Sequence, residues 1–513
     1  VHNGIIENYL EIKNYLINKG IVFSSETDTE VVVQLLEYYY AKSNDIMAAL
    51  YKVLSRIRGA YALGVLCSDH PDKIIAARKD APLLIGYGED CNFIASDIAA
   101  VLRYTDRYIE ITEDETAVVG KNFIKIIDSA GIEREWVEKR AEWTLEAAEK
   151  GGYAHFMLKE IFEESDVLTR TLSPHIKDSL PNFLSPLLSP DALKNYGHIH
   201  IVACGTAYHA GLVGKAAIER LCRMRVSTAL ASEFRYSDPI IDKNDLVIVI
   251  SQSGETADTL AALRLAKQVG AATLAIVNVV GSSVAREADD TIFTLCGPEI
   301  AVASTKAYTV QIGVLYLLAL HIAYSVGALE KAAASDLTEE LSRAIPKKIE
   351  SVFGLVEKIK GLAAAYANSQ SIFFIGRGFD YALSREAALK CKEISYIHCE
   401  GYAAGELKHG TISLIEEGTP VIALMGDPAV SDKVINGVRE VKSRGADVLI
   451  LASGAIEISG DCADKLLQLP DTSPLFSPLV FATAVQLLAY YLTVTIGLDP
   501  DKPRNLAKSV TVE

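Results

Sequence analysis

The sequence predicts an α/β protein in which two tandem, doubly wound parallel sheets follow a smaller α+β domain. Beyond residue 152, short apolar runs alternate with helical segments, which is typical of parallel βα units. This series of runs occurs twice, and the residues before it follow a mixed pattern of helix and short strands. A length of 513 residues is enough for roughly three domains that each bury a core.

The composition is that of a soluble, acidic, globular protein. The chain has 66 acidic and 50 basic residues, a formal charge of -16, and is half hydrophobic. Contacts to a nucleic-acid backbone need clustered Lys and Arg, so this excess of acidic residues argues against a nucleic-acid partner. Any anionic ligand must therefore be bound at a local site and not by a general positive surface. The 8 cysteines lack the spacing of a zinc site or a disulfide framework. We therefore expect a cytoplasmic protein without a metal site.

The first 143 residues are interpreted as an α+β layer structure. A helix is expected near residues 7–19, and β-rich runs follow at residues 61–67, 73–78, 83–86 and 93–96. A polar stretch at residues 144–152 is interpreted as a linker. The chain opens with Val-His-Asn-Gly and shows neither an initiator Met nor a signal pattern, so we interpret it as a fragment.

The rest of the chain contains a duplication. After a helical region from residue 159 to about residue 173, four strands are predicted at residues 199–203, 246–250, 273–277 and 291–295. Three of them have counterparts at residues 371–375, 421–425 and 447–451, at offsets of about 171 to 175 residues. We therefore predict one α/β domain at residues 153–340, a second at residues 341–499, and a tail at residues 500–513.

Two apolar stretches, residues 307–328 and 475–498, raise the question of membrane spans. Each contains internal polar groups, such as Gln311 and Gln486, and lies among segments typical of a soluble protein. We therefore expect buried core or dimer helices, and no membrane partner.

A phosphate site is predicted where the strand at residues 246–250 runs into Ser251-Gln252-Ser253-Gly254-Glu255-Thr256, just before a helix. Backbone N–H groups and the dipole of a helix N-terminus can hold a phosphate without any Lys. An ordinary helix cap is the alternative, but three hydroxyls, an amide and a glycine in six residues exceed what a cap needs. The duplicate loop at residues 426–430 lacks the hydroxyls, so we expect only the first copy to bind phosphate.

Two further loops offer hydroxyls near the expected ligand. Thr206 follows the first strand of the first copy, where open α/β sheets place ligand-binding loops. Its neighbour Cys204 is interpreted as a small buried residue and not as a nucleophile. Ser304 precedes the first long apolar helix, and either a capping role or a ligand role would explain it.

Ionisable residues gather in the second copy. Glu386, Lys390 and Glu393 are spaced i, i+4 and i+7, so a helix places all three on one face. A solvated salt-bridge ladder is the alternative, but the neighbouring residues are apolar. His409 lies in a short glycine-bounded segment and can act as an acid or base near neutral pH. The tail at residues 503–513 has no clear period, and a frayed end is the default expectation.

Five separated motifs together resemble one enzyme family, glutamine-fructose-6-phosphate aminotransferase (isomerizing), also called glucosamine-6-phosphate synthase. They occur in the family's order and the resemblance covers essentially the whole chain. The motifs are residues 2–4, 25–30, 251–256, 405–410 and 503–513.

The resemblance implies that the duplicated units are two sugar isomerase domains. It implies that the sugar phosphate is bound by Ser251, Gln252, Ser253 and Thr256, with Thr206, Val302 and Ser304 nearby. By the same resemblance Lys508 is the Schiff-base lysine, Glu393 moves a proton between C1 and C2, and Lys390 and Glu386 support it. His409 opens the sugar ring and comes from the neighbouring subunit, which would make a homodimer obligatory.

The implied reaction is the conversion of fructose 6-phosphate to glucosamine 6-phosphate, with glutamine or ammonia as the nitrogen source, in amino-sugar biosynthesis. Converting a ketose to an imine and moving a proton needs an amine, a carboxylate and a His, which are the residue types found above. No dinucleotide fingerprint is present, and we expect no cofactor.

Residues 1–143 resemble an incomplete N-terminal-nucleophile glutaminase domain. In the family the catalytic Cys is the first residue of the mature chain, whereas this sequence begins with Val1. The resemblance therefore implies that this chain, as given, does not hydrolyse glutamine. Asn3 and Gly4 resemble the oxyanion-hole pair, and Asp28 resembles the acid that binds the amino group of glutamine.

Two alternatives share the phosphate loop. The first is a glutamine-independent sugar-phosphate isomerase or deaminase, which Asn3, Gly4 and Asp28 argue against. The second is a non-catalytic sugar-phosphate sensor. A sensor would need a DNA-binding or partner domain, for which no basic segment is found, and it would leave His409 and Lys508 without a role.

Overall fold

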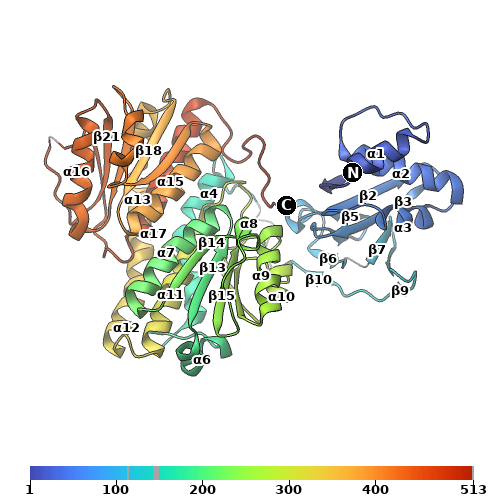
Figure 1. Ribbon diagram of the computed structural model, residues 1–513, viewed down its shortest axis with the longest axis horizontal. Helices are drawn as coiled ribbons and strands as arrows, with labels where there is room; N and C mark the ends of the chain where they lie inside the picture. Colours follow the sequence, from blue (N-terminus) through green and yellow to red (C-terminus); the bar gives the residue numbers. More distant parts are fainter. Residues whose placement is uncertain (113–114, 142–148, 461, 511–513) are drawn as a thin grey trace. The chain divides into compact units, whose positions relative to one another are not determined.

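The computed structural model describes residues 1–112, 115–141, 149–460 and 462–510 (Figure 1). The chain forms two compact units, one built mainly from residues 1–148 and the other mainly from residues 149–508. Of the linker predicted at residues 144–152, residues 144–148 lie outside the described part of the chain.

The N-terminal unit has the predicted α+β layer structure. Its helices are α1 (Tyr9–Ile17), α2 (Asp28–Ser43), α3 (Ile46–Leu54) and the 3-10 turn η1 (Ile98–Ala100). One antiparallel sheet has the order β1-β2-β3-β7-β8-β9, formed by His2–Gly4, Tyr61–Cys67, His70–Lys79, Glu115–Gly120, Ile124–Asp128 and Glu133–Arg134. A second has the order β10-β6-β4-β5, formed by Lys139–Arg140, Arg107–Glu110, Leu84–Tyr87 and Asn92–Ala95.

Alternation along β2 explains these layers. Leu63 packs into a core with Ile12 of α1, whereas its neighbour Ala62 packs into a core with Ile85 and Ile109 of the second sheet. Successive side chains of a strand point to opposite faces, so the larger sheet has helices on one face and the smaller sheet on the other.

The larger unit contains two parallel five-stranded sheets of identical topology. The first has the order β14-β13-β15-β16-β17, formed by Val226–Leu230, His198–Ala203, Asp245–Ser251, Ala272–Val277 and Asp290–Phe293. The second has the order β19-β18-β20-β21-β22, formed by His398–Ala403, Ser371–Gly376, Pro420–Met425, Asp447–Ser453 and Lys465–Leu469. The predicted duplication is thereby confirmed for the three predicted pairs of strands, β13 and β18, β15 and β20, and β16 and β21, and the sheets add two pairs that were not predicted, β14 and β19, and β17 and β22.

Helices cover both faces of the first sheet. The helices are α7 (Gly205–Cys222), α8 (Ala231–Phe234), α9 (Ala257–Val269), α10 (Ser283–Glu287) and α11 (Lys306–Ser325). Ile201 and Ile248 pack with α7 and α11, whereas Val202 and Val249 pack with α9, so the sheet is buried between two helical layers (Figure 1). This doubly wound arrangement is the predicted fold class.

The second copy is built similarly and is joined to the first by helices. Its helices are α15 (Phe379–Ser395), η6 (Leu407–His409), η7 (Thr411–Leu414), η8 (Pro428–Val430), α16 (Ser431–Lys442) and α17 (Ser477–Ile496). Between the copies lie α12 (Lys331–Glu339), the π-helix η5 (Glu340–Ala344), α13 (Ile345–Phe353) and α14 (Val356–Ala365). Before the first sheet lie β11 (Ile176–Lys177), β12 (Leu180–Pro181), η4 (Pro186–Leu188) and α6 (Pro190–Asn195).

The two apolar stretches form α11 and α17. In the described part of the chain these two helices have the length and hydropathy of a membrane span, but 94% and 78% of their most apolar windows are buried inside the structure. They supply much of the core that both copies share, as predicted for core helices.

The helical region predicted from residue 159 to about residue 173 is two helices, α4 (Phe156–Phe162) and α5 (Glu164–Leu172), followed by the turn η3 (Ser173–His175).

The C-terminal segment contacts α4 through Asp501. Both carboxylate oxygens of Asp501 accept hydrogen bonds from the first turn of α4, from the N–H of Phe156 at 2.9 Å and of Met157 at 2.8 Å. Asp501 therefore satisfies a helix N-terminus just before the tail of residues 503–513. Within that tail the N–H of Arg504 donates to the hydroxyl of Tyr396 at 2.7 Å, so the expectation of a frayed end is wrong at Arg504.

Candidate active site

The predicted phosphate loop lies at a topological switch point. In the strand order β14-β13-β15-β16-β17 the direction of winding reverses between β13 and β15. Ligands of open α/β sheets bind outside the carboxyl ends of such strands. Ser251 ends β15 and α9 begins at Ala257, so the loop connects a strand at this point to a helix N-terminus, as expected.

The loop has a fixed shape. The Oγ of Ser251 accepts a hydrogen bond from the N–H of Gly254 at 2.9 Å, and the oxygen of Gly254 accepts one from the N–H of Val284 at 3.0 Å. Gly254 has φ +67, and a Cβ there would lie 2.1 Å from the Oγ of Ser282. Only glycine fits this position, so the loop is pre-organised for a ligand.

The duplicate loop binds a carboxylate of α15, at the position that corresponds to the predicted phosphate site of the first copy. Gly426 follows β20, and its N–H donates to Oδ2 of buried Asp380 at 2.8 Å. Burial, and then the charge of Asp427, raises the pKa of Asp380 to about 7, against the hydrogen bonds from the N–H groups of Gly426 and Asp427. This contact supports the prediction that only the first copy binds phosphate.

Glu386, Lys390 and Glu393 share one face of α15, as predicted. The Nζ of Lys390 lies 3.4 Å from Oε1 of Glu386 and 2.9 Å from Oε2 of Glu393. The side chains of Lys390 and Glu386 are only 1% and 2% exposed, so the alternative of a solvated ladder is wrong. Burial lowers the pKa of Lys390, but the charges of Glu393 and Glu386 outweigh burial and raise that pKa above its usual value.

Residues of the first copy complete this cluster. The Oγ1 of Thr206, on α7, donates to Oε1 of Glu386 at 3.0 Å and accepts from Nζ of Lys390 at 3.1 Å. The Nδ1 of His209 lies 2.8 Å from Oε2 of Glu386. Sequence reasoning did not single out His209. Its i, i+3 spacing from Thr206, which places both on one face of α7, was the available signal.

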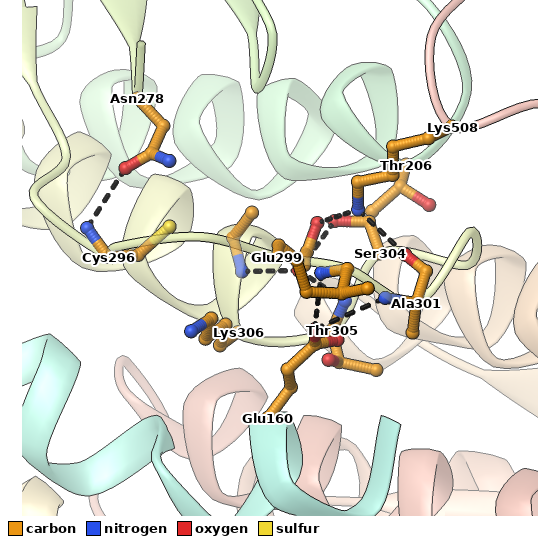
Figure 2. A network of polar contacts seen from close by, with 12 residues as sticks. Glu160, Thr206, Asn278, Cys296, Glu299, Ala301, Ser304, Thr305, Lys306 and Lys508 are labelled. Carbon is orange, nitrogen blue, oxygen red and sulfur yellow. Dashed lines mark hydrogen bonds and ion pairs between the residues drawn. The ribbon is translucent and has the colours of Figure 1, made fainter. Parts of the chain in front are cut away.

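Lys508 of the tail is held by two oxygens of one loop. Its Nζ donates to Oε2 of Glu299 at 2.5 Å and to the backbone oxygen of Ala301 at 2.8 Å (Figure 2). Burial raises the pKa of Glu299, but the charge and hydrogen bond of Lys508, with the N–H groups of Ala307 and Thr305, outweigh burial and leave it below its usual value. Glu299 was not identified from the sequence, because a lone Glu after Gly-Pro gives no pattern.

Ser304 and Val302 lie in the same loop. The Oγ of Ser304 donates to Oε1 of Glu299 at 3.3 Å, and the structure shows no side-chain cap on α11, so the capping interpretation of Ser304 is wrong. The N–H of Val302 donates to the backbone oxygen of Asp501 at 3.1 Å, which links the loop to the tail. The loop, the tail up to Lys508 and the cluster on α15 all belong to one compact unit.

The structure places His409 on the surface and Cys204 in a half-buried position. His409 is exposed on η6, and in the described part of the chain it forms no hydrogen bond or ion pair with Lys508 or Glu393. Cys204 precedes α7 and is half-buried, and burial followed by the charge of Asp258 raises the pKa of its thiol. A thiol with a raised pKa is a poor nucleophile, in agreement with the interpretation of Cys204 as a packing residue.

The residues that resemble a glutamine site lie close together in the N-terminal unit. Asn3 and Gly4 are in β1, and the Oδ2 of Asp28 accepts from the N–H of Ile6 at 2.8 Å. Gly4 has φ +132, and a Cβ there would lie 2.1 Å from the oxygen of Ala60, so no other residue fits.

Glu30 of the same motif has a structural role. Its carboxylate accepts hydrogen bonds from the N–H groups of Ser24 at 2.8 Å and Ser25 at 2.6 Å, while the Oγ1 of Thr27 accepts from the N–H of Glu30. This is a helix capping arrangement at the start of α2. The hydrogen bonds from the Ser25 hydroxyl and the Ser24 N–H lower the pKa of Glu30 to about 2.

Family models match both parts of the chain. A SIS domain model matches residues 192–321 and 365–496, which contain the two parallel sheets. A glutamine amidotransferase domain model matches residues 1–103.

Curated relatives match over the whole chain. The glutamine–fructose-6-phosphate aminotransferase [isomerizing] of Caldanaerobacter subterraneus subsp. tengcongensis is 50% identical over 515 residues, which cover 100% of this chain and 84% of the relative. The protein of that name from Clostridium tetani is 49% identical, with the same coverage of both chains.

Solved structures share the fold of the larger unit. The C-terminal domain of glucosamine-fructose-6-phosphate aminotransferase from Francisella tularensis is 36% identical with a TM-score of 0.66, covering 69% of this chain and 100% of that chain. A glucosamine-6-phosphate deaminase from Thermotoga maritima, 24% identical with a TM-score of 0.55, covers 69% of this chain and 99% of its own and shares the fold alone. Both of these curated relatives span the whole of this sequence and carry the same name, and the chain belongs to the glutamine–fructose-6-phosphate aminotransferase (isomerizing) family.

Proposed function

We propose that this protein converts fructose 6-phosphate and glutamine to glucosamine 6-phosphate, with the sugar chemistry in the larger unit. The observation that carries this assignment is the amine of Lys508, held 2.5 Å from the buried carboxylate of Glu299. The carboxylate orients the primary amine, which attacks a carbonyl in its neutral form. The glutamine amidotransferase match supports glutamine as the nitrogen source and argues against an isomerase or deaminase that does not use glutamine.

Each group has a role in the sugar reaction. The loop of Ser251, Gln252, Ser253 and Thr256 binds the phosphate. Lys508 adds as a neutral amine to C2 of the open-chain ketose, and the carbonyl oxygen leaves as water. Ammonia then displaces Lys508 from C2 and leaves an imine there. A base moves a proton from C1 to C2, and the proton of the C1 hydroxyl passes to the nitrogen, which gives an aldehyde at C1 and an amine at C2.

Glu393 is our candidate for that base. It is the member of the α15 cluster with the more exposed carboxylate, 23% against 2% for Glu386, so it is the one that substrate can reach. Lys390 supplies a buried positive charge beside it, which stabilises the anionic form of Glu393 and the negative charge that develops on the substrate. Glu386 and Thr206 hold Lys390 in position.

Two further proposals concern the oligomeric state of the protein and its cellular compartment. We propose that the protein is a cytoplasmic homodimer in which His409 of one copy reaches the sugar site of the other and opens the ring. The exposure of His409 on η6 supports a contact outside its own site. All eight cysteines are free, which supports a reducing compartment.

Borohydride trapping tests the assignment of Lys508. Reduction of the protein with fructose 6-phosphate should add the mass of the reduced sugar to the peptide that contains Lys508, and Lys508→Ala should abolish the adduct. Lys502→Ala, a change at an exposed lysine of the same tail, should leave the adduct unchanged. An adduct that persists in Lys508→Ala, or lies on another lysine in the wild-type protein, would show that the assignment is wrong.

A further inference from the structure

The loop that holds Lys508 is itself held by a buried carboxyl group of α4. The Oε1 atom of Glu160 accepts hydrogen bonds from two consecutive backbone groups, the N–H of Ile300 at 2.5 Å and of Ala301 at 3.2 Å (Figure 2). Glu160 is only 2% exposed, so this contact is shielded from water. The reaction as described above does not use Glu160.

The two N–H groups lie in the peptides on either side of Ile300, between the two residues that supply the acceptors of Lys508. Glu160 thereby holds the peptide planes that join Glu299 to Ala301. The Ala301 carbonyl lies in the next peptide plane, whose Val302 N–H donates to the backbone oxygen of Asp501. Glu160 therefore restrains the backbone between the two acceptors and fixes their spacing.

The same helix also anchors the other side of Lys508. Asp501 accepts from the first turn of α4 with both carboxylate oxygens, and its backbone oxygen accepts from the N–H of Val302. The loop and the tail on either side of Lys508 are thus both tied to α4, at its middle by Glu160 and at its start by Asp501.

We propose that Glu160 is a positioning residue for Lys508, which holds the loop of Glu299 and Ala301 in the geometry that imine formation requires. This inference rests on the proposed role of Lys508. A negative charge on Glu160 is not required, because Glu299 already neutralises the charge of Lys508. Positioning requires only an oxygen atom that accepts hydrogen bonds from the two N–H groups.

The surroundings of Glu160 favour the neutral, protonated form of its carboxyl group. The ionisable groups that face Glu160 are Glu299, Lys508 and Lys306, and Lys306 is paired with Glu163 at 2.7 Å. Burial and the charge of Glu299 raise the pKa of Glu160 to about 8, against the two lysines and the N–H of Ile300. At neutral pH Glu160 is mostly protonated, and Gln is then a close mimic of its shape and polarity.

The test compares Glu160→Met with Glu160→Gln. Met fills a similar volume but offers no oxygen to the two N–H groups, whereas Gln retains an amide oxygen. We expect the rate of borohydride-trappable imine formation with fructose 6-phosphate to fall at least about tenfold in Glu160→Met, from the loss of two hydrogen bonds. The rate in Glu160→Gln should stay within about threefold of the wild-type rate.

Two further measurements separate positioning from general damage. Affinity for a hexitol 6-phosphate, which binds through its phosphate but has no carbonyl, should be unchanged in both variants. Glu164→Met removes a neighbouring buried carboxylate, which accepts from Thr309 and Thr483, and should lower stability without slowing imine formation.

The outcomes distinguish the inference from the proposed function. If the wild-type protein traps no sugar on Lys508, the proposed function fails first. If it does, and Glu160→Met traps at the wild-type rate, or Glu160→Gln is as slow as Glu160→Met, the positioning role of Glu160 is wrong. A fall in hexitol phosphate affinity parallel to the fall in rate would also overturn it, because the defect would then extend beyond Lys508.

Discussion

The hydroxyl of Thr206 donates to the carboxylate of Glu386 at 3.0 Å, across 180 residues of sequence. Thr206 lies in the first turn of α7 in the first copy of the α/β domain, and Glu386 lies on α15 of the second. The cluster of Glu386, Lys390 and Glu393 therefore lies where the two copies meet. In the proposed site the first copy supplies the phosphate loop, and the second copy supplies the carboxylates and the lysine.

Removing the buried cation should destabilise the larger unit strongly. Lys390→Met leaves the buried carboxylate of Glu386 without a counter-charge, and breaking such a pair costs about 3–5 kcal/mol. Urea unfolding should be followed by circular dichroism, because both tryptophans precede residue 149 in the sequence and the larger unit therefore contains none. The double variant Glu386→Gln/Lys390→Met should recover part of the loss.

The double variant also provides the control. Both substitutions affect residues assigned to the chemistry, so activity should be absent in each variant, and only stability separates them. If the double variant is no more stable than Lys390→Met alone, then the loss comes from packing and the uncompensated charge of Glu386 is not its cause.

Ser253→Ala should weaken binding of fructose 6-phosphate by roughly one to two decades. A hydrogen bond to a charged group contributes about 1.5–3 kcal/mol, and every 1.4 kcal/mol is a factor of ten in affinity. Calorimetric titration should show this loss for fructose 6-phosphate and no change for fructose, which has no phosphate. Ser443→Ala, at an exposed serine of the second copy, should bind both sugars as the wild type does. Equal affinity of Ser253→Ala and wild type for the phosphorylated sugar would contradict the phosphate assignment.

The sequence was most informative where burial leaves a continuous apolar run. The central strands β13, β15, β20 and β21 are buried on both faces by helices, so their positions could be predicted closely. Three strands at sheet edges, β14, β19 and β22, were not predicted, because an edge strand is only partly covered and polar residues interrupt its pattern.

In the candidate site, too, some residues could be predicted from the sequence and others could not. Glu386, Lys390 and Glu393 could be placed on one face because the helical period is local. The roles of Glu299, His209 and Glu160 could not be predicted, because each depends on a partner more than 100 residues away. Local patterns show which residues share an element, whereas only the tertiary fold shows which elements meet.

Asp380 makes the larger unit sensitive to pH, and Asp380→Asn should reduce that sensitivity. The pKa of Asp380 is about 7 in the folded protein, above its ordinary value of 3.8. Its contribution to stability is therefore complete below about pH 4 and is lost as pH rises toward 7, since the unfolded state releases the proton first. The free energy of unfolding falls by about 1.4 kcal/mol per pH unit in this window. Between pH 5 and pH 7, urea unfolding should show a wild-type loss on the order of 2 kcal/mol larger than that of Asp380→Asn. Asp191→Asn, an exposed change on α6, should follow the wild type. Parallel pH profiles for wild type and Asp380→Asn would show that the internal carboxylate is ionised throughout, like an ordinary aspartate.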